Sequence, residues 1–408
     1  MTNYHGINKF TVSVLSFLII LLAMTSCSTV PQKENDEFFH HDEKLQLEKR
    51  NYDMDIIDYI NWRGDLTFEQ DPLNEIDALV FAQLSYVQLK NIAPSTISEH
   101  KTIEQICKDF ESSPDFETRK DTGPLINTDT NILLKVAAKS NRFKNIPICN
   151  FVHEVNEEKG IQFAAYTALL PKNHILIAYE GTYVEAVGWK EDFSMAYEYP
   201  VPAQVRSSEY ADYIADNFDG VITLCGHSKG GNLAAYAIAN CNSKTQARID
   251  KAYSFDGQGF QKEVIKKGVF KDTEKRIENY NPQDSVIGQL LHKVGNVHII
   301  HSYTRKKMWQ HDPFTWNVIG KQFVREEKFS KYSQKINHEM NNLIDSLNTE
   351  ERKDLIDGIF DIFDVAEAYT LQDFQEKAPK KMPEILEYIS NLESKTKENL
   401  RRFIKIFI

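Results

Sequence analysis

Hydrophobic positions along the chain switch between strand-like and helix-like patterns. Short apolar runs predict strands over residues 162–169, 174–179, 221–225, 251–255, 276–280 and 296–302. Helical spacing predicts an amphipathic helix over 74–89, a second helix over 207–218 and a third in the alanine-rich stretch after 232. Because strands alternate with helices, the pattern indicates an α/β fold, with a mostly parallel sheet covered by helices on both faces.

The sequence pattern changes near residue 331, and from there it is typical of charged helices. Apolar residues recur there at helix spacing, as at Ile336, Met340, Leu343 and Leu355. We interpret residues 331–408 as a C-terminal helical extension packed on the domain. The alternative is that its apolar stripe binds a membrane surface.

The N-terminus carries a targeting pattern. Lys9 precedes an apolar run over 10–23, too short for a comfortable membrane span, and small residues follow up to Cys27. The run at 24–27 (MTSC) resembles the lipobox of bacterial lipoproteins, which implies that Cys27 is acylated and becomes the new N-terminus. A plain secretory signal or an uncleaved anchor are the alternatives, and each places the mature chain outside the cytoplasm.

Four regions follow from these patterns. Residues 1–27 are the signal peptide, 28–50 a polar tether, 51–330 the α/β domain and 331–408 the helical extension. The chain has 408 residues, 41% of them hydrophobic, which is ample for a large core. Its net charge of −11 argues against a nucleic-acid partner.

The cysteines suggest neither a disulfide framework nor a metal site. Of five, Cys27 is assigned to lipid, and the spacing of Cys107, Cys149, Cys225 and Cys241 matches no zinc or disulfide pattern. We expect no metal and no cofactor.

The stretch 221–239 contains the strongest candidate for chemistry. Gly226, Ser228 and Gly230 have the G-x-S-x-G spacing at a turn between a predicted strand and a predicted helix. A serine on such a strained turn exposes its hydroxyl, and the glycines avoid crowding at the bend. We therefore predict that Ser228 is a nucleophile and that the Lys229 amide faces a developing oxyanion. An ordinary tight turn is the alternative.

A serine nucleophile needs a base, and the base needs a carboxylate. In α/β-hydrolases these residues follow the serine in the order acid, then histidine. Asp284 lies just past a predicted strand and Asp256 ends an earlier one. We favour Asp284, because Asp256 follows the strand directly after the nucleophile unit.

For the base we favour His311, which stands in a loop beyond the last predicted strand. His298 and His301 fall within or beside that strand, where a hydrogen-bonded structural role is the favoured interpretation. A zinc site made from these three histidines lacks a compact ligand pattern. We interpret His227 as a packing residue of the serine turn.

Several segments resemble class 3 (fungal-type) lipases. Residues 226–231 (GHSKGG) look like the serine turn of those enzymes, with lysine in place of their usual leucine. Residues 177–182 (IAYEGT) resemble their strand ending in Arg-Gly-Thr, which implies that Thr182 lines the oxyanion hole. Asp284 to Val286 is similar to the Asp-x-Val segment that supplies their acid.

A closer resemblance is to the bacterial DUF2974 (Mbeg1-like) group, relatives of those lipases. Residues 254–260 (SFDGQGF) and 311–316 (HDPFTW) both look like its recurrent segments. The resemblance covers roughly residues 53–323. It implies an α/β-hydrolase fold and a reaction class, but no particular substrate.

The expected activity is hydrolysis of carboxylic esters, including lipid esters, through an acyl-enzyme on Ser228, Asp284 and His311. Thr182 and the Lys229 amide would bind the oxyanion. Two alternative hypotheses remain: a surface binding protein that keeps the fold without catalysis, and a serine peptidase or amidase. The aromatic segment 183–204 is either a lid or acyl-contacting wall, or a packed irregular loop.

Overall fold

The computed structural model describes residues 53–123 and 126–407, and its centre is an eight-stranded sheet. The strands lie side by side in chain order: β1 (Lys101–Thr102), β2 (Pro147–Asn156), β3 (Ile161–Leu170), β4 (His174–Tyr179), β5 (Val221–His227), β6 (Ile249–Phe255), β7 (Ile277–Pro282) and β8 (Asn296–Ile300). Strands β4 to β8 are parallel and β1 to β4 antiparallel. The α/β-hydrolase-like fold expected from the sequence is confirmed.

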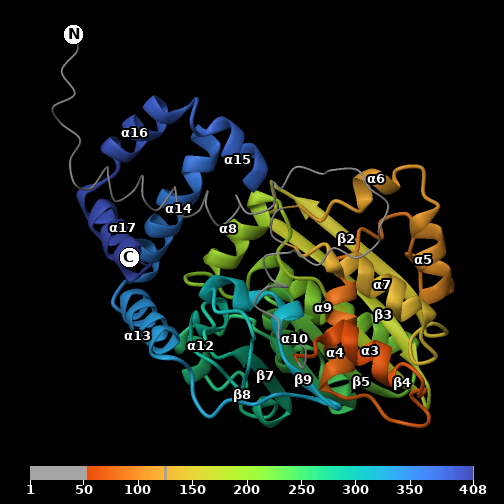
Figure 1. The fold of residues 1–408 in the computed structure, drawn as a ribbon. Helices are drawn as coiled ribbons and strands as arrows, with labels where there is room; N and C mark the ends of the chain where they lie inside the picture. Colours follow the sequence, from red (N-terminus) through yellow and green to blue (C-terminus); the bar gives the residue numbers. More distant parts are fainter. Residues whose placement is uncertain (1–52, 124–125, 408) are drawn as a thin grey trace.

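Helices cover both faces of the sheet (Figure 1). The first face carries α3 (Ile56–Arg63), α4 (Glu75–Leu84), α5 (Ile103–Glu111) and α7 (Asp129–Lys139); the second carries α9 (Pro202–Asn217) and α10 (Lys229–Asn240). Alternation along β4 separates the two cores, because Leu176 and Ala178 join the first and Ile175 and Ile177 the second. Shorter helices are α6 (Phe116–Arg119), α11 (Ser243–Arg248) and α12 (Lys262–Lys266).

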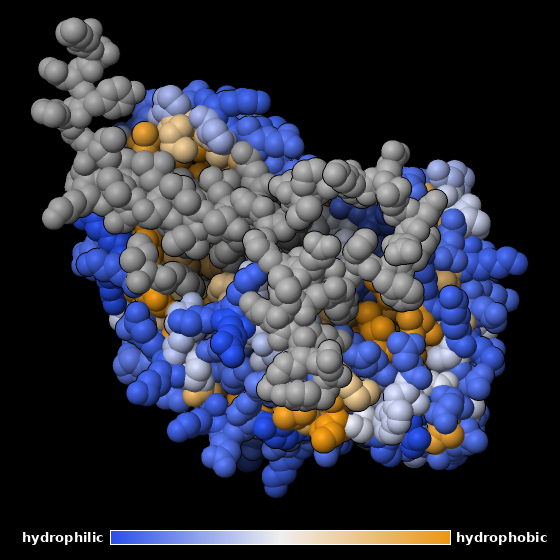
Figure 2. All heavy atoms as spheres, viewed as in Figure 1, coloured by the Kyte–Doolittle hydropathy of each residue, from blue (hydrophilic) through white to orange (hydrophobic). Residues whose placement is uncertain are grey.

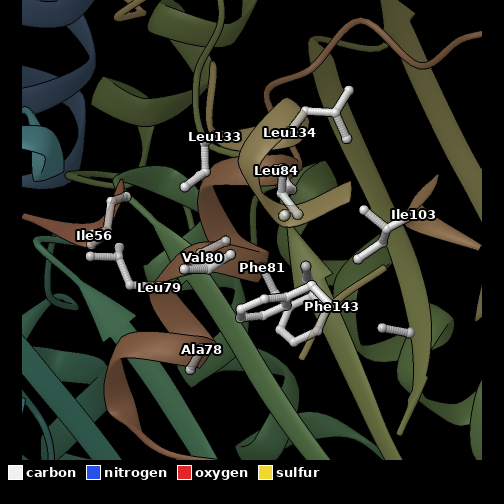
Figure 3. Packing of buried hydrophobic residues seen from close by; sticks show 14 of the residues in the cluster. Ile56, Ala78, Leu79, Val80, Phe81, Leu84, Ile103, Leu133, Leu134 and Phe143 are labelled. Atoms are coloured by element: carbon white, nitrogen blue, oxygen red, sulfur yellow. The ribbon is translucent and has the colours of Figure 1, made fainter. Parts of the chain in front are cut away.

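Helix α4 is buried on every side, so the amphipathic helix predicted over 74–89 is wrong in character and too long. Every residue from Ile76 to Leu84 is buried, including Asp77 and Gln83. The helix lies between the sheet and α3 and α7, where Figure 3 shows its apolar side chains meeting those of neighbouring helices. A helix enclosed in this way has no solvent face on which to carry polar residues.

The predicted strands are confirmed to within one or two residues at most ends. The sequence reading missed β2, whose pairing with β3 is interrupted by an irregularity between Cys149 and Val152. Asn150 sits there with φ +49°. Such an interruption breaks the two-residue alternation on which strand prediction depends.

The C-terminal extension is a helical unit with its own core. It comprises α13 (Lys331–Asp345), α14 (Thr349–Val365), α15 (Leu371–Lys377), α16 (Met382–Asn391) and α17 (Ser394–Phe407). The predicted stripe residues Ile336, Met340 and Leu355 are buried inside it, so their interpretation as core is confirmed.

Segment 183–204 contains a helix, α8 (Ala186–Ser194), so the irregular-loop alternative is wrong. Figure 1 shows α8 between the sheet and the C-terminal helices drawn in blue. Phe193 packs on Phe360 of α14 and Phe403 of α17, with ring centroids 5.3 and 6.5 Å apart. The Ala186 N–H donates to the Tyr369 carbonyl at 2.8 Å.

Several sequence-based predictions lie outside the described residues: the signal peptide at 1–27, the tether at 28–50 and acylation of Cys27. Within the described part of the chain, no helix is both long and apolar enough to cross a membrane. Its four cysteines are all buried and unpaired. On the face drawn in Figure 2, hydrophilic side chains dominate, with apolar patches between them.

Candidate active site

The turn between β5 and α10 holds Ser228 in a strained conformation, with φ +56° and ψ −128°. The flanking glycines are required by space. A Cβ added to Gly226 would lie 2.2 Å from the Gly230 carbonyl carbon, and one added to Gly230 would lie 2.2 Å from the Tyr179 oxygen. The G-x-S-x-G pattern therefore forms the close-packed turn predicted for it, with Ser228 where strand meets helix.

His311 is paired with Asp256 rather than with Asp284. Its Nδ1 lies 2.7 Å from Asp256 Oδ2, and the carboxylate is fully buried. The other carboxylate oxygen, Oδ1, accepts from Asn281 at 2.9 Å and from Ser285 at 2.5 Å. Hydrogen bonds, with His311 first among the stabilising contacts, overcome the effect of burial and lower the pKa of Asp256.

Asp284, predicted as the acid, is hydrogen-bonded to Gln310 rather than to His311. Its backbone N–H donates to Gln310 Oε1 at 2.9 Å, and its Oδ2 accepts from Gln310 Nε2 at 3.1 Å. It therefore fixes the residue before His311 instead of the imidazole itself. The prediction was wrong because β6 neighbours β5 directly and ends level with it, which places the residue after β6 beside the nucleophile turn.

Contacts between β5 and β6 bring Asp256 beside the serine turn. The Ser228 N–H donates to the Phe255 carbonyl at 2.9 Å, and Phe255 directly precedes Asp256. Asp256 also has a left-handed backbone, with φ +47°. Two strained non-glycine residues thus stand on adjacent strand ends, which is typical of functional sites.

His227 anchors the His311 loop as well as packing in the turn. Its Nε2 lies 2.9 Å from the His311 carbonyl oxygen, so that nitrogen carries the proton, and Nδ1 accepts from the Tyr86 hydroxyl at 3.0 Å. The two imidazole rings are 4.5 Å apart. Burial, followed by the charge of His311, lowers the pKa of His227 to about 3, so it stays neutral.

Thr182 follows β4 and is buried against the turn. Its hydroxyl donates to Asp192 Oδ2 of α8, and Asp192 Oδ1 accepts from Gln258 Nε2 at 3.1 Å. Burial raises the pKa of Asp192 to about 6 despite the nearby Lys229 ammonium. Sequence analysis did not single out Asp192, because its contact with Thr182 depends on where α8 packs.

The Lys229 side chain is wholly buried beneath the serine turn. Its ammonium donates to Glu191 Oε2 at 3.0 Å and to both the backbone oxygen and Oε1 of Gln162, each at 2.8 Å. Three N–H groups thus meet three acceptors. As the first residue of α10, Lys229 also has a backbone N–H that the helix cannot bond internally.

Glu180 takes the position of the arginine in the lipase pattern. Its carboxylate accepts from Gln162 Nε2 at 3.3 Å. Burial, reinforced by the charge of Glu185, raises its pKa to about 8. The residue is therefore protonated over much of the neutral range.

The remaining histidines near β8 have separate partners. His298 lies 2.7 Å from Glu278, and His301 lies 2.7 Å from Glu326. Their interpretation as hydrogen-bonded structural residues is confirmed, and the described residues contain no group of three potential metal ligands.

The mostly parallel sheet with helices on both faces defines an α/β-hydrolase-like fold. The strained serine and the aspartate of the aspartate–histidine pair follow two of its neighbouring parallel strands. The family model described as Mbeg1-like matches residues 137–361, more than half of the chain, and the chain belongs to this family.

The comparison with solved structures includes the crystal structure of M37 lipase, with a TM-score of 0.33 and 12% sequence identity. That similarity covers 52% of this chain and 67% of the lipase. A search of curated proteins finds no significant match.

Proposed function

We propose that this protein is a serine hydrolase that cleaves carboxylic esters through an acyl-enzyme. The observation that carries the proposal is the His311 imidazole held 2.7 Å from a buried Asp256 carboxylate. Asp256 follows the carboxyl end of β6, next to the end of β5 where Ser228 is strained. Membership of the Mbeg1-like family and the α/β-hydrolase-like fold are consistent with hydrolase chemistry.

In the proposed reaction, His311 Nε2 takes the Ser228 hydroxyl proton while the serine oxygen attacks the ester carbonyl carbon. Asp256 accepts from His311 Nδ1–H, which fixes the tautomer and stabilises the imidazolium. The tetrahedral intermediate then breaks its bond to the leaving alcohol, which takes the proton from His311. Water enters next, and the same steps release the acid.

The oxyanion that forms in both halves of this reaction needs donors placed before the substrate arrives. We assign this role to the backbone N–H groups of Lys229 and Thr182. The Thr182 hydroxyl is already committed to Asp192, so the side chain serves to orient its residue. Removing one such donor contribution typically lowers kcat about a hundredfold or more.

Fluorophosphonate labelling tests the nucleophile. We expect the wild-type protein to be labelled and Ser228→Ala to be unlabelled. His311→Asn should also abolish labelling, whereas His298→Asn, which removes an imidazole with an equally close carboxylate partner, should not. Labelling of Ser228→Ala at the wild-type rate, or no labelling of a well-folded wild type, would contradict the proposal.

The acid is tested by comparing two aspartates. Asp256→Asn should lower kcat by about four orders of magnitude, because the amide would favour the wrong imidazole tautomer. Asp284→Asn keeps a hydrogen-bonding group toward Gln310 and should have a far smaller effect. A reversed order would return the role to Asp284.

A panel of matched ester and amide substrates distinguishes the alternatives. Faster turnover of esters supports the proposed activity, and a preference for amides would support a peptidase or amidase. Tight binding of an ester without turnover or labelling would support a binding protein.

We also propose that the protein is a lipoprotein anchored to the cell envelope through Cys27, outside the cytoplasm. The support is the apolar run before a lipobox-like MTSC sequence. Metabolic labelling with an alkyne fatty acid should mark the wild type and not Cys27→Ala. Equal labelling of both would refute acylation at this residue.

A further inference from the structure

The buried lysine next to the candidate nucleophile has an unusual environment. The ammonium of Lys229 and the carboxylate of Glu191 are 3.0 Å apart, with side-chain exposures of 0% and 1%. Removing two charges from water is costly, and an apolar side chain of similar volume would often serve packing as well or better. The pair therefore needs an explanation beyond packing.

Glu191 connects α8 to the elements around the serine turn. Its Oε2 accepts from Lys229 of α10 and from the Gln162 N–H of β3, and its Oε1 accepts from the Ala203 N–H at the start of α9. The distances are 3.0, 3.1 and 2.7 Å. One carboxylate thus fixes where α8 stands relative to β3, α9 and α10.

The next residue of α8 holds the other side of the oxyanion site. Asp192 accepts from the Thr182 hydroxyl and from Gln258 Nε2. Consecutive residues of one helix therefore hold the side chains of Lys229 and Thr182, whose backbone N–H groups are the two proposed oxyanion donors. Through Asp192, α8 is linked to the Thr182 side chain beside the serine turn.

We propose that Lys229 and Glu191 form a positioning pair, which fixes α8 against the serine turn so that Asp192 keeps Thr182 in place for oxyanion binding. This inference rests on the proposed ester hydrolysis. The two side chains touch no reacting atom, whereas the backbone N–H of Lys229 is one of the proposed oxyanion donors. The ion pair acts through Asp192 and Thr182, and a displacement of about 1 Å in such a site can cost about a hundredfold in rate.

A double-mutant cycle between Lys229→Met and Thr182→Ala tests the proposal. The readouts are kcat and KM for a p-nitrophenyl ester and the rate of fluorophosphonate labelling. Lys229→Met should lower kcat by about ten- to a hundredfold and leave KM nearly unchanged. In the Thr182→Ala background the same change should cost less than about twofold, since contacts in one network are not additive.

Arg142→Met is the matched control. It breaks another buried ion pair, with Asp77, in which both side chains are fully buried. A loss of stability alone should therefore appear in this variant too. Any effect of Arg142→Met on kcat should be the same in the wild-type and Thr182→Ala backgrounds, because the two sites share no partner.

Glu191→Gln keeps the shape of the carboxylate and provides a second variant should Lys229→Met fail to fold. It should reproduce the fall in kcat and the non-additivity with Thr182→Ala. A folded Lys229→Met or Glu191→Gln protein with wild-type kcat, or losses that multiply fully with Thr182→Ala, would overturn the proposal. Absence of Ser228-dependent labelling in the wild type would instead refute the hydrolase activity.

Discussion

Two ion pairs of this protein have both side chains buried, and they differ in what they hold together. The first joins Arg142 to Asp77 beside α4, and the second joins Lys229 to Glu191 beneath the serine turn. Both are shielded from water. The comparison shows that equal burial does not imply an equal role.

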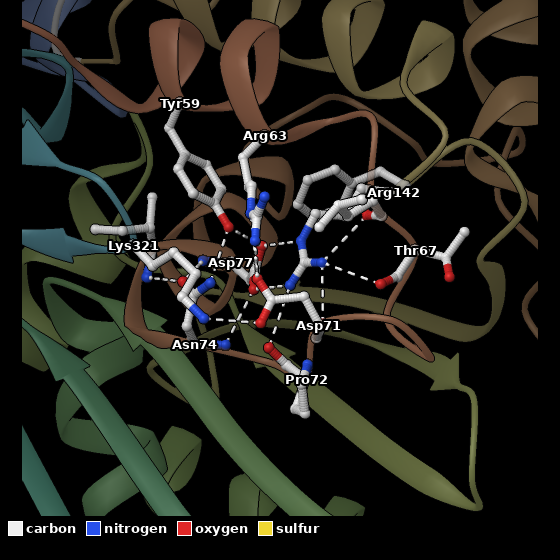
Figure 4. A network of polar contacts seen from close by, with 12 residues as sticks. Tyr59, Arg63, Thr67, Asp71, Pro72, Asn74, Asp77, Arg142 and Lys321 are labelled. Carbon is white, nitrogen blue, oxygen red and sulfur yellow. Dashed lines mark hydrogen bonds and ion pairs between the residues drawn. The ribbon is translucent and has the colours of Figure 1, made fainter.

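The Arg142 guanidinium ties down one local segment (Figure 4). Besides Asp77, it donates to backbone carbonyls of residues 66–72. Its carbon also lies 4.1 Å from the centre of the Phe68 ring. The planar fork matches several fixed acceptors at once, as arginine does at rigid structural sites.

The Lys229 ammonium has fewer partners, but they come from different parts of the chain. Glu191 and Gln162 belong to α8 and β3, and Glu191 extends the connection to α9. The first network thus stabilises a segment, whereas the second fixes the relative positions of elements that surround a site.

The largest expected effect is on the first network. Arg142→Met leaves the Asp77 carboxylate buried without its partner, so the free energy of unfolding should fall by about 3–5 kcal/mol. Urea denaturation measures it, and kcat per folded molecule should not change. A loss below about 1 kcal/mol would show that the guanidinium is dispensable for stability.

The second-largest expected effect is a pH dependence of the free energy of unfolding that originates from Glu180, near Lys229. The folded pKa is about 8 and the ordinary value 4.5. Between these values the folded state keeps a proton that the unfolded chain has lost, so stability falls as pH rises, by up to about 1.4 kcal/mol per pH unit.

Glu180→Gln mimics the protonated side chain and should remove this slope. The measurement is denaturation of both proteins at several pH values between about 5 and 8. The stability of the variant relative to the wild type should increase as pH rises. Parallel pH profiles would contradict the assignment of the proton to Glu180.

The third prediction tests how the C-terminal extension holds α8. Phe193→Ala removes a ring that packs on Phe360 and Phe403. Because Phe193 is only partly buried, we expect a loss of about 2 kcal/mol, below the value for a fully buried phenylalanine. If α8 positions Thr182, kcat should fall as well. An unchanged kcat would separate the extension from the site.

The smallest effect is expected for Lys190→Ala. Its ammonium lies 3.5 Å from both Asp357 and Asp361 of α14, on a surface where it is 40% exposed. Such pairs contribute less than about 1 kcal/mol. Thermal denaturation should show little change, and a loss as large as that of Phe193→Ala would mean that charge rather than apolar packing attaches α8.

Local sequence patterns predicted the parts of this fold that depend on local chemistry. Strands β3 to β8 follow from apolar runs, and the serine turn follows from glycines that only a close-packed bend requires. Strand β2 was missed because its irregularity near Asn150 breaks the alternation. The burial of α4 also escaped detection, since enclosure by other elements is a tertiary property.

In the candidate site, too, features set by local sequence could be predicted and tertiary contacts could not. His311 was predicted as the base from its place in the chain, and Asp284 was favoured over Asp256 as its partner. The structure pairs His311 with Asp256, and the correct choice required knowing which strand end lies level with β5. The roles of Glu191 and Asp192 depend on where α8 packs. Chain order carried no information about that packing.

The burial of the cysteines has a practical consequence. Burial raises the pKa of Cys107 to about 11 and that of Cys149 to about 12, and Cys225 and Cys241 are buried too. Thiol reagents should therefore leave the described part of the native chain unmodified. In a Cys27→Ala background, a fluorophore attached through Tyr369→Cys, at a side chain 62% exposed, would report any separation of the C-terminal extension from α8.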